Sequence, residues 1–256
     1  TRSVLGASTN QFIGPDGTVL NTNAVANRLG NPNLTPETHK EWELGLEAQF
    51  LNNRIGIDIS MYDKTSEDLI INLPLDPSTG YTTTSVNGAT VINKGIEAAL
   101  NLTPVRGEIE WNLTLNYTRN RPVVDEILVD GIDEINIAGY SNLGNYAIEG
   151  EPYGVMRGTD FNRTDDGELI VNNQGSYTAN SEIVTIGNPN PDFQTNWINT
   201  VTWKGISFGF QWSYTHGGDI YSTTVGSMMA RGNTTDTGQN RFQPIILNGV
   251  KSDGSP

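Results

Sequence analysis

The sequence predicts an all-β fold, an antiparallel transmembrane β-barrel of which this chain forms only an arc. Apolar and polar residues alternate with a period of two in three hairpins, at about 42–62, 94–120 and 193–215. The turns within the hairpins are short, and the connections between them are long. Aromatic residues gather near both ends of the apolar faces. This combination is typical of barrels that contact lipid on the outside and water on the inside.

The first hairpin shows the alternation most simply. One face is apolar and is made by Trp42, Leu44, Leu46, Ala48 and Phe50 and, after an Asn-rich turn at 51–54, by Ile55, Ile57, Ile59 and Met61. Such a turn between two alternating runs predicts a β-hairpin. Glu41, Glu43 and Glu47 share the other face. We expect these carboxylates to line a water-filled lumen rather than to act as a catalytic pair.

The other two hairpins repeat this pattern around turns at 104–107 and 204–205. Mid-strand apolar residues are predicted to face acyl chains, among them Leu100, Leu113 and Phe208. The aromatic residues predict two interface belts, one near the short turns and one near the long loops. The first belt comprises Phe50, Trp111 and Trp203, and the second comprises Trp42, Tyr62, Tyr117, Trp212 and Tyr214. The short turns would then lie in the periplasm.

Composition excludes several classes of protein. The 256 residues include no cysteine, which excludes a disulfide framework, and only two histidines, which disfavours a zinc site. The net charge of −14 argues against nucleic-acid binding. There is no apolar run near the length of about 18 residues that a membrane-spanning helix needs. We expect no enzymatic activity, no cofactor and no metal.

The whole chain, 1–256, is predicted to belong to one barrel domain, with long extracellular loops at about 73–92, 121–192 and 217–256. Residues 1–36 are predicted as loop with a short strand near 18–20. The middle loop holds thirteen acidic and three basic residues. Three tyrosines of this loop, Tyr140, Tyr146 and Tyr153, are candidate ligand contacts near the barrel mouth.

Within this loop, 151–161 and 168–172 are possible strands joined at Asp166-Gly167. The segment 160–168 resembles a calcium loop, but its glycine stands at position eight rather than six. A hairpin turn is favoured there, and calcium binding stays open.

Several ordered motifs resemble the SusC/RagA-like TonB-dependent outer-membrane transporters. They are Asn31-Pro32-Asn33-Leu34, Glu43-Leu44-Gly45-Leu46-Glu47, Asn93-Lys94-Gly95-Ile96-Glu97, the segment 186–193 and the segment 217–222. The resemblance covers roughly residues 31–225 and corresponds to the C-terminal part of that family's barrel. The motifs look architectural, with Gly45 and Gly95 at positions where a side chain would crowd a neighbouring strand.

This resemblance implies a 22-stranded barrel in the outer membrane of a Gram-negative cell, crossing it many times. It implies import of glycans, peptides or similar oligomers, powered by the TonB complex and covered by a SusD-like surface lipoprotein. The family's plug domain and TonB box have no counterpart in this chain, which we therefore expect to be a piece of a longer protein. The alternative is a soluble or surface-exposed β-domain that binds glycan and buries its aromatic residues in a sandwich core.

Overall fold

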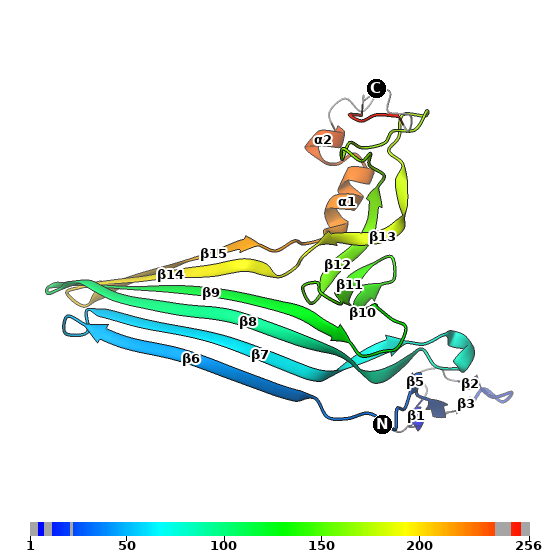
Figure 1. The fold of residues 1–256 in the computed structure, drawn as a ribbon, viewed down its shortest axis with the longest axis horizontal. Coiled ribbons are helices and arrows are strands. Elements are labelled where there is room, and N and C mark those ends of the chain that lie inside the picture. The colour runs from blue at the N-terminus through cyan, green and yellow to red at the C-terminus, as the bar shows by residue number, and fades with distance from the viewer. Residues whose placement is uncertain (1–4, 8–11, 21–22, 239–246, 252–256) are drawn as a thin grey trace.

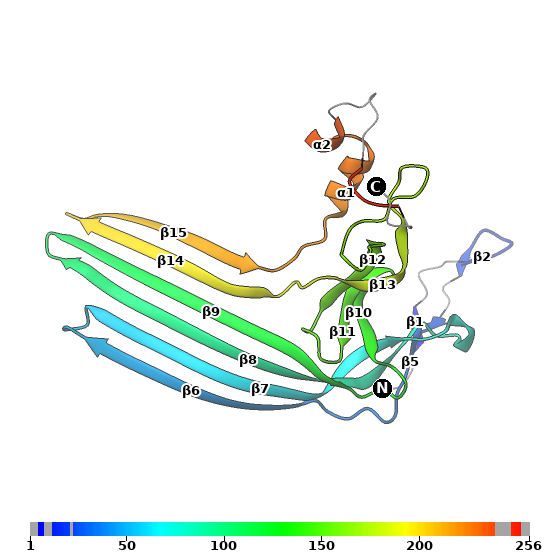
Figure 2. The same ribbon diagram turned by 45° about the horizontal axis from the view of Figure 1, so that its top comes forward.

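The computed structural model describes residues 5–7, 12–20, 23–238 and 247–251. Its main feature is a long, curved antiparallel sheet with the strand order β15-β14-β9-β8-β7-β6 (Figures 1 and 2). These strands are β6 (Thr38–Phe50), β7 (Ile55–Pro74), β8 (Thr83–Arg106), β9 (Ile109–Ile127), β14 (Pro191–Trp203) and β15 (Ile206–Gly217). The sheet is an open arc, because its two outermost long strands, β6 and β15, do not pair with each other.

The three predicted hairpins are present, and their strands are longer than predicted. The predicted loop at 73–92 is wrong: β7 continues to Pro74 and β8 already begins at Thr83. Its residues stay in the sheet because Ala89 and Val91 are buried in a core outside the predicted hairpins. Only a short connection with one 3₁₀ turn, η1 (Pro77–Thr79), remains. The Ser78 amide donates to the Asp76 carboxylate at 2.8 Å and lowers the pKa of that group.

A second, four-stranded sheet stands at the long-loop end of the main sheet (Figure 1). It comprises β10 (Glu134–Tyr140), β11 (Leu143–Ile148), β12 (Val155–Phe161) and β13 (Ala179–Gly187). The predicted loop at 121–192 thus contains the end of β9 and these four strands; its extracellular location stays a prediction. Two small hydrophobic cores hold this sheet against the ends of β7, β8 and β9 that lie farthest from the short turns. One core contains Ile71, Ala89 and Ile135. The other contains Val91, Val124 and Ala147.

The predicted turn at Asp166-Gly167 is confirmed. The Gly167 amide donates to the Thr164 carbonyl at 2.8 Å, and the Thr164 amide donates to the Glu168 carbonyl at 2.9 Å. Gly167 has a φ of +86°, which glycine adopts without strain. The possible strand at 151–161 is present but begins at Val155. The possible strand at 168–172 is not a regular strand, because its residues form only isolated β-bridges.

The predicted loop at 217–256 contains two helices among its described residues, α1 (Thr223–Ala230) and α2 (Thr235–Gly238). Ser222 caps α1, because its Oγ accepts a hydrogen bond from the Val225 amide at 3.2 Å. Helix α1 was not predicted from the sequence, because it has only eight residues and a weak amphipathic pattern. In the described parts of the chain, neither helix has the length and apolar content that crossing a membrane requires.

The described part of the N-terminal segment forms two small two-stranded sheets. β1 (Leu5–Ala7) pairs with β4 (Asn23–Val25), and β2 (Phe12–Ile13) pairs with β3 (Val19–Leu20), close to the strand predicted near 18–20. Next, β5 (Arg28–Leu29) runs parallel to the start of β8. The Asn31-Pro32-Asn33-Leu34 motif follows, where the Asn31 amide group donates to the Ser85 carbonyl at 2.9 Å. This motif thus attaches the lead-in segment to β8.

Candidate functional site on the two faces of the main sheet

The strand register separates the main sheet into two chemically different faces. One row across all six long strands reads Ala48, Ile57, Leu100, Leu115, Trp197 and Trp212. The adjacent row reads Glu47, Asp58, Ala99, Asn116, Asn196 and Ser213. Neighbouring rows point to opposite sides of a sheet. We call the side with Leu100 the apolar face and the side with Glu47 the polar face.

The apolar face is open to its surroundings. Leu44, Phe208 and Trp212 are each more than 60% exposed, and no other described element covers them. The sequence-predicted lipid-facing residues Leu100, Leu113 and Phe208 all lie on this face. Soluble monomers rarely expose an apolar surface of this extent, so this face is suited to contact with another apolar surface.

Seven of the eight predicted belt residues lie on the apolar face. Phe50 and Trp203 are the last residues of their strands at the short turns, and Trp111 lies close to the same end. Trp42, Tyr117, Trp212 and Tyr214 lie farther from those turns. Their membrane depth stays a prediction.

Tyr62 is the exception, because it lies on the polar face. It stands opposite Glu43 on β6 and Gly95 on β8. The apolar residues of β7 have odd numbers, so an even-numbered residue must point to the other side. Its hydroxyl donates to the Asn120 side chain at 3.3 Å. Tyr62 is therefore not part of a lipid-facing belt in this structure.

Gly95 is required beneath the Tyr62 ring. A Cβ at Gly95 would overlap the ring, whereas a Cβ at Gly45 would come no closer than 3.9 Å to the Ile59 carbonyl. The predicted crowding is thus confirmed at Gly95 and wrong at Gly45. The sequence marks both positions as glycine, but only the cross-strand register shows which one carries an aromatic neighbour.

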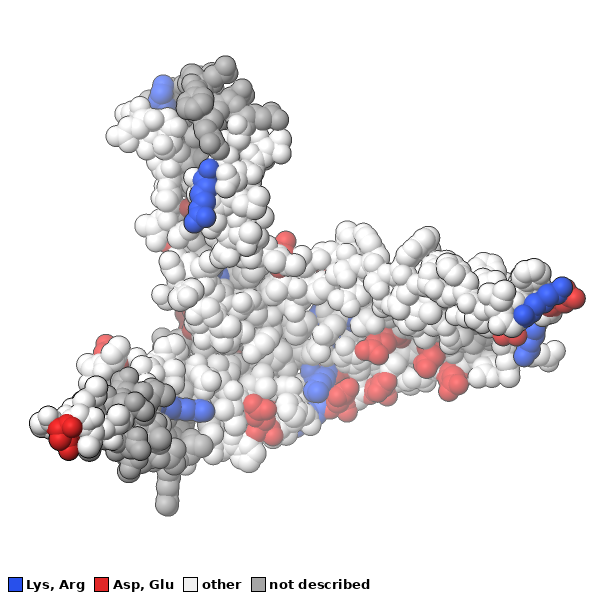
Figure 3. Space-filling view, turned by 180° about the vertical axis from the view of Figure 1, so that it is seen from behind, with Lys and Arg blue, Asp and Glu red and all other residues white. Residues whose placement is uncertain are grey.

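The polar face is acidic and internally hydrogen-bonded. Acidic side chains gather along the lower strands in Figure 3, and the register places Glu43, Glu47, Asp58 and Glu97 on this face. Five strands, β6, β7, β8, β9 and β14, contribute to a pocket of about 440 Å³ there, from Glu43 to Asn196. Neighbouring side chains bond across the strands, for instance Ser213 Oγ with Asn196 Oδ1 at 2.7 Å. This face is suited to water and polar solutes.

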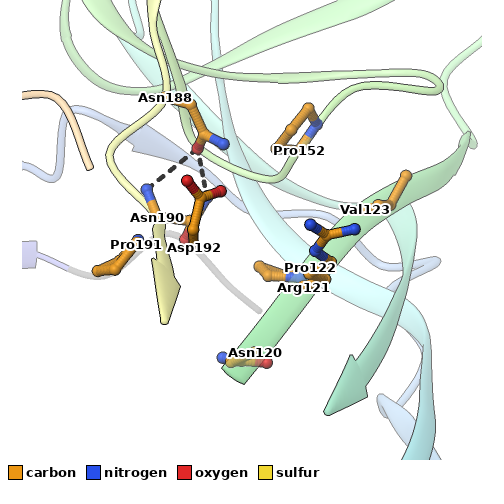
Figure 4. Close-up of a pocket in the computed structure, with 9 residues that line it drawn as sticks. All are labelled: Asn120, Arg121, Pro122, Val123, Pro152, Asn188, Asn190, Pro191 and Asp192. Atoms are coloured by element: carbon orange, nitrogen blue, oxygen red, sulfur yellow. Dashed lines mark hydrogen bonds between the residues drawn. The ribbon is translucent and has the colours of Figure 1, made fainter. Parts of the chain in front are cut away.

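A smaller pocket of about 250 Å³ lies at the long-loop end, between β9 and the 188–192 segment (Figure 4). The Asn188 side-chain oxygen accepts from both the amide and the side chain of Asn190, at 3.0 and 2.9 Å. The Asn190 side chain also donates to the Tyr153 carbonyl at 2.9 Å. On the other side, the Asn188 amide donates to Asp219 at 2.8 Å. The motif at 186–193 therefore clamps the two sheets and the 217–219 segment together.

The three candidate ligand tyrosines differ in accessibility. Tyr140 is 77% exposed, whereas Tyr146 is buried and donates its hydroxyl hydrogen to the Ser141 carbonyl at 2.8 Å. Tyr153 is half-buried, and burial raises the pKa of its phenol, with Glu37 adding to the effect. Of the three, Tyr140 presents the most exposed ring; a ligand role for these tyrosines stays a prediction.

Two features of the apolar face were missed from the sequence. Asn199 lies among apolar neighbours, is buried, and accepts a hydrogen bond from the Trp111 indole at 3.3 Å. Arg119 and Arg121 lie on the same side of β9 as Leu115 and extend that face toward the long-loop end. The period of two predicts both from the sequence. It places Asn199 on the same side as Trp197 and Val201, and it places Arg119 and Arg121 on the same side as Tyr117. No cluster of metal-ligating side chains occurs within the described ranges.

Comparison with known proteins agrees with this two-faced architecture. The family model described as TonB dependent receptor-like, beta-barrel matches residues 5–235. The chain belongs to the TonB-dependent receptor β-barrel family. It is 27% identical to TonB-dependent receptor P26 of Formosa agariphila over an alignment that covers 86% of the present chain. It is 29% identical to TonB-dependent receptor SusC of Bacteroides thetaiotaomicron over 38% of its length.

Among solved structures, the RagAB peptide importer in the closed-closed state matches 84% of this TonB-dependent receptor barrel with a TM-score of 0.62 and 18% identity. That similarity supports the fold, an arc of a SusC/RagA-like barrel. The chain spans about a quarter of the length of P26 and of the RagAB chain, at 26% and 24%. Its match to SusC covers 10% of that protein.

Proposed function

We propose that this chain is a section of the wall of an outer-membrane importer. The observation that carries the proposal is the division of one sheet into an exposed apolar face and an acidic polar face. The nine residues from Trp42 to Phe50 match the roughly 9–11 residues with which a tilted strand crosses a bilayer. In lipid, backbone groups must be paired by a closed barrel, so β6 and β15 would pair with further strands. Family resemblance suggests 22 strands in total.

The polar face supports the role of a hydrated passage. Its acidic and amide side chains would line the interior, and the exposed ring of Tyr140 stands at the long-loop end, where it could contact a sugar or a peptide. We propose that the cargo is an oligomeric nutrient, a glycan or a peptide. The TonB complex would power import, and a SusD-like lipoprotein would close the mouth. These proposals draw on the relatives named SusC and RagAB.

The test uses cells that carry or lack the gene for the full-length protein. Fluorescent pools of oligosaccharides and of peptides are supplied separately, and the label in the periplasm is measured with and without a protonophore. We expect one pool to accumulate only in cells that carry the gene, and the accumulation to stop when the proton gradient collapses. Equal accumulation in both strains for every pool would contradict the proposal.

A further inference from the structure

A group of positive charges continues the apolar face at its long-loop end. Lys94 stands opposite Arg121, and Ile96 stands opposite Arg119, in adjacent same-side rows of β8 and β9. These four residues share the face of Leu100. Together with Met61, Gly95 and Tyr117 they line a shallow pocket of about 340 Å³. One wall is thus cationic, and the other is apolar and aromatic.

The charges in this pocket are only partly balanced. Lys94 Nζ lies 3.2 Å from the Asp63 carboxylate, and on the strand beyond, Lys40 pairs with Glu67 at 2.6 Å. The guanidinium groups of Arg119 and Arg121 form no ion pair or side-chain hydrogen bond with any part of the chain that the structure describes; only their backbones are paired, in the β8–β9 ladder. Asp192 shares the pocket of Figure 4 with Arg121 but makes no ion pair with it. Two neighbouring guanidinium groups without a carboxylate partner favour an external anion.

We propose that Arg119, Arg121 and Lys94 bind the phosphate of a membrane lipid headgroup whose acyl chains lie along the apolar face. Arginine pairs with phosphate through two parallel hydrogen bonds, which favours phosphate over a diffuse negative surface. The apolar wall favours a lipid over free phosphate, because Met61, Ile96 and Tyr117 offer nothing to an inorganic ion. The site lies at the long-loop end, so the lipid would belong to the outer leaflet. This inference rests on the membrane location proposed above.

The experiment uses the purified full-length protein in detergent, with fluorescent bisphosphorylated lipid A as the probe. The variant Arg119→Gln/Arg121→Gln removes two charges from the pocket. Its matched control, Arg54→Gln/Arg106→Gln, removes two charges at the short-turn end, where the Arg106 guanidinium donates to the Asn52 carbonyl at 3.4 Å. We expect the pocket variant to raise the Kd about tenfold or more and the control to leave it unchanged. Arg119→Lys/Arg121→Lys keeps both charges but loses the parallel guanidinium hydrogen bonds, so its Kd should lie between those of the wild type and the pocket variant.

Further arms separate the source of the anion. Dephosphorylated lipid A should bind the wild type and the pocket variant equally weakly, and inorganic phosphate at millimolar concentration should not displace the probe. Equal Kd values for wild type and pocket variant would overturn the inference, as would displacement by free phosphate. Should the double variant not assemble, Arg121→Gln alone replaces it, with the same criteria. If the wild type does not fractionate with the outer membrane, the proposed function and this inference both fail; unchanged lipid binding in a membrane-inserted variant overturns the inference alone.

Discussion

Gly95 and Gly45 show how a single hydrogen side chain is required at one position and only tolerated at another. Gly95→Ala would force the Tyr62 ring away from β8 and break its contact with Asn120. We expect this to lower the free energy of unfolding by about 1–3 kcal/mol, the usual cost of overpacking. Gly45→Ala has room and should change it little. Urea titration of the refolded full-length protein in detergent compares the two; equal losses would contradict the packing account.

The neighbouring residues Leu100 and Asn101 test the assignment of the faces. Leu100 lies on the apolar face beside Ile57 and Leu115, whereas Asn101 lies on the polar face and accepts a hydrogen bond from Thr114 at 2.8 Å. Leu100→Arg should cost about 2–4 kcal/mol if this residue lies near the bilayer midplane. Asn101→Arg should cost much less, because its charge remains in water. The same loss for both in a folding titration into lipid vesicles would show that the faces are wrongly assigned.

At the scale of elements, the 188–192 segment is the joint between the two sheets. Asn190→Ala removes the hydrogen bonds from its side chain to the Tyr153 carbonyl and to Asn188. The Tyr153 carbonyl would lose the Asn190 side chain as its hydrogen-bond donor, so we expect faster amide hydrogen exchange in β10 to β13 and little change in β6 and β7. Asn196→Ala, which removes an amide on the polar face of β14, is the control. Unchanged exchange in the four-stranded sheet would exclude a clamp role for Asn190.

The orientation of the elements is a second prediction at this scale. The chain has no cysteine, so single introduced cysteines report their own positions. In the full-length protein, Tyr140→Cys on the four-stranded sheet should react with a membrane-impermeant maleimide on intact cells. Asn52→Cys in a short turn should react only after the outer membrane is made permeable. Labelling in the reverse order would invert the proposed topology.

At the scale of the whole molecule, the outer edges of β6 and β15 pair with no other strand among those that the structure describes. Exposed edges and an exposed apolar face both promote association between chains. We therefore expect residues 1–256, produced alone, to aggregate without detergent. Size-exclusion chromatography with light scattering checks this. A monodisperse, detergent-free monomer that unfolds cooperatively would contradict the barrel-wall proposal and favour a soluble β-domain.

The sequence by itself determined the all-β class, the three hairpins and the composition of both faces. The period of two is a local property, since each residue's side follows from its number along the strand. The family motifs at 31–34 and 186–193 were equally visible, because they are contiguous in the chain.

Only the tertiary structure decided what lies across the strands and above them. The register between strands decides that Tyr62 lies over Gly95 and that Lys94 stands opposite Arg121. The segment 121–192 looked like loop because its strands are short and acidic, yet Ile135 and Ala147 are buried against β7, β8 and β9. That burial is a long-range gain in hydrophobic free energy, which a local pattern of charge and turn residues does not reveal.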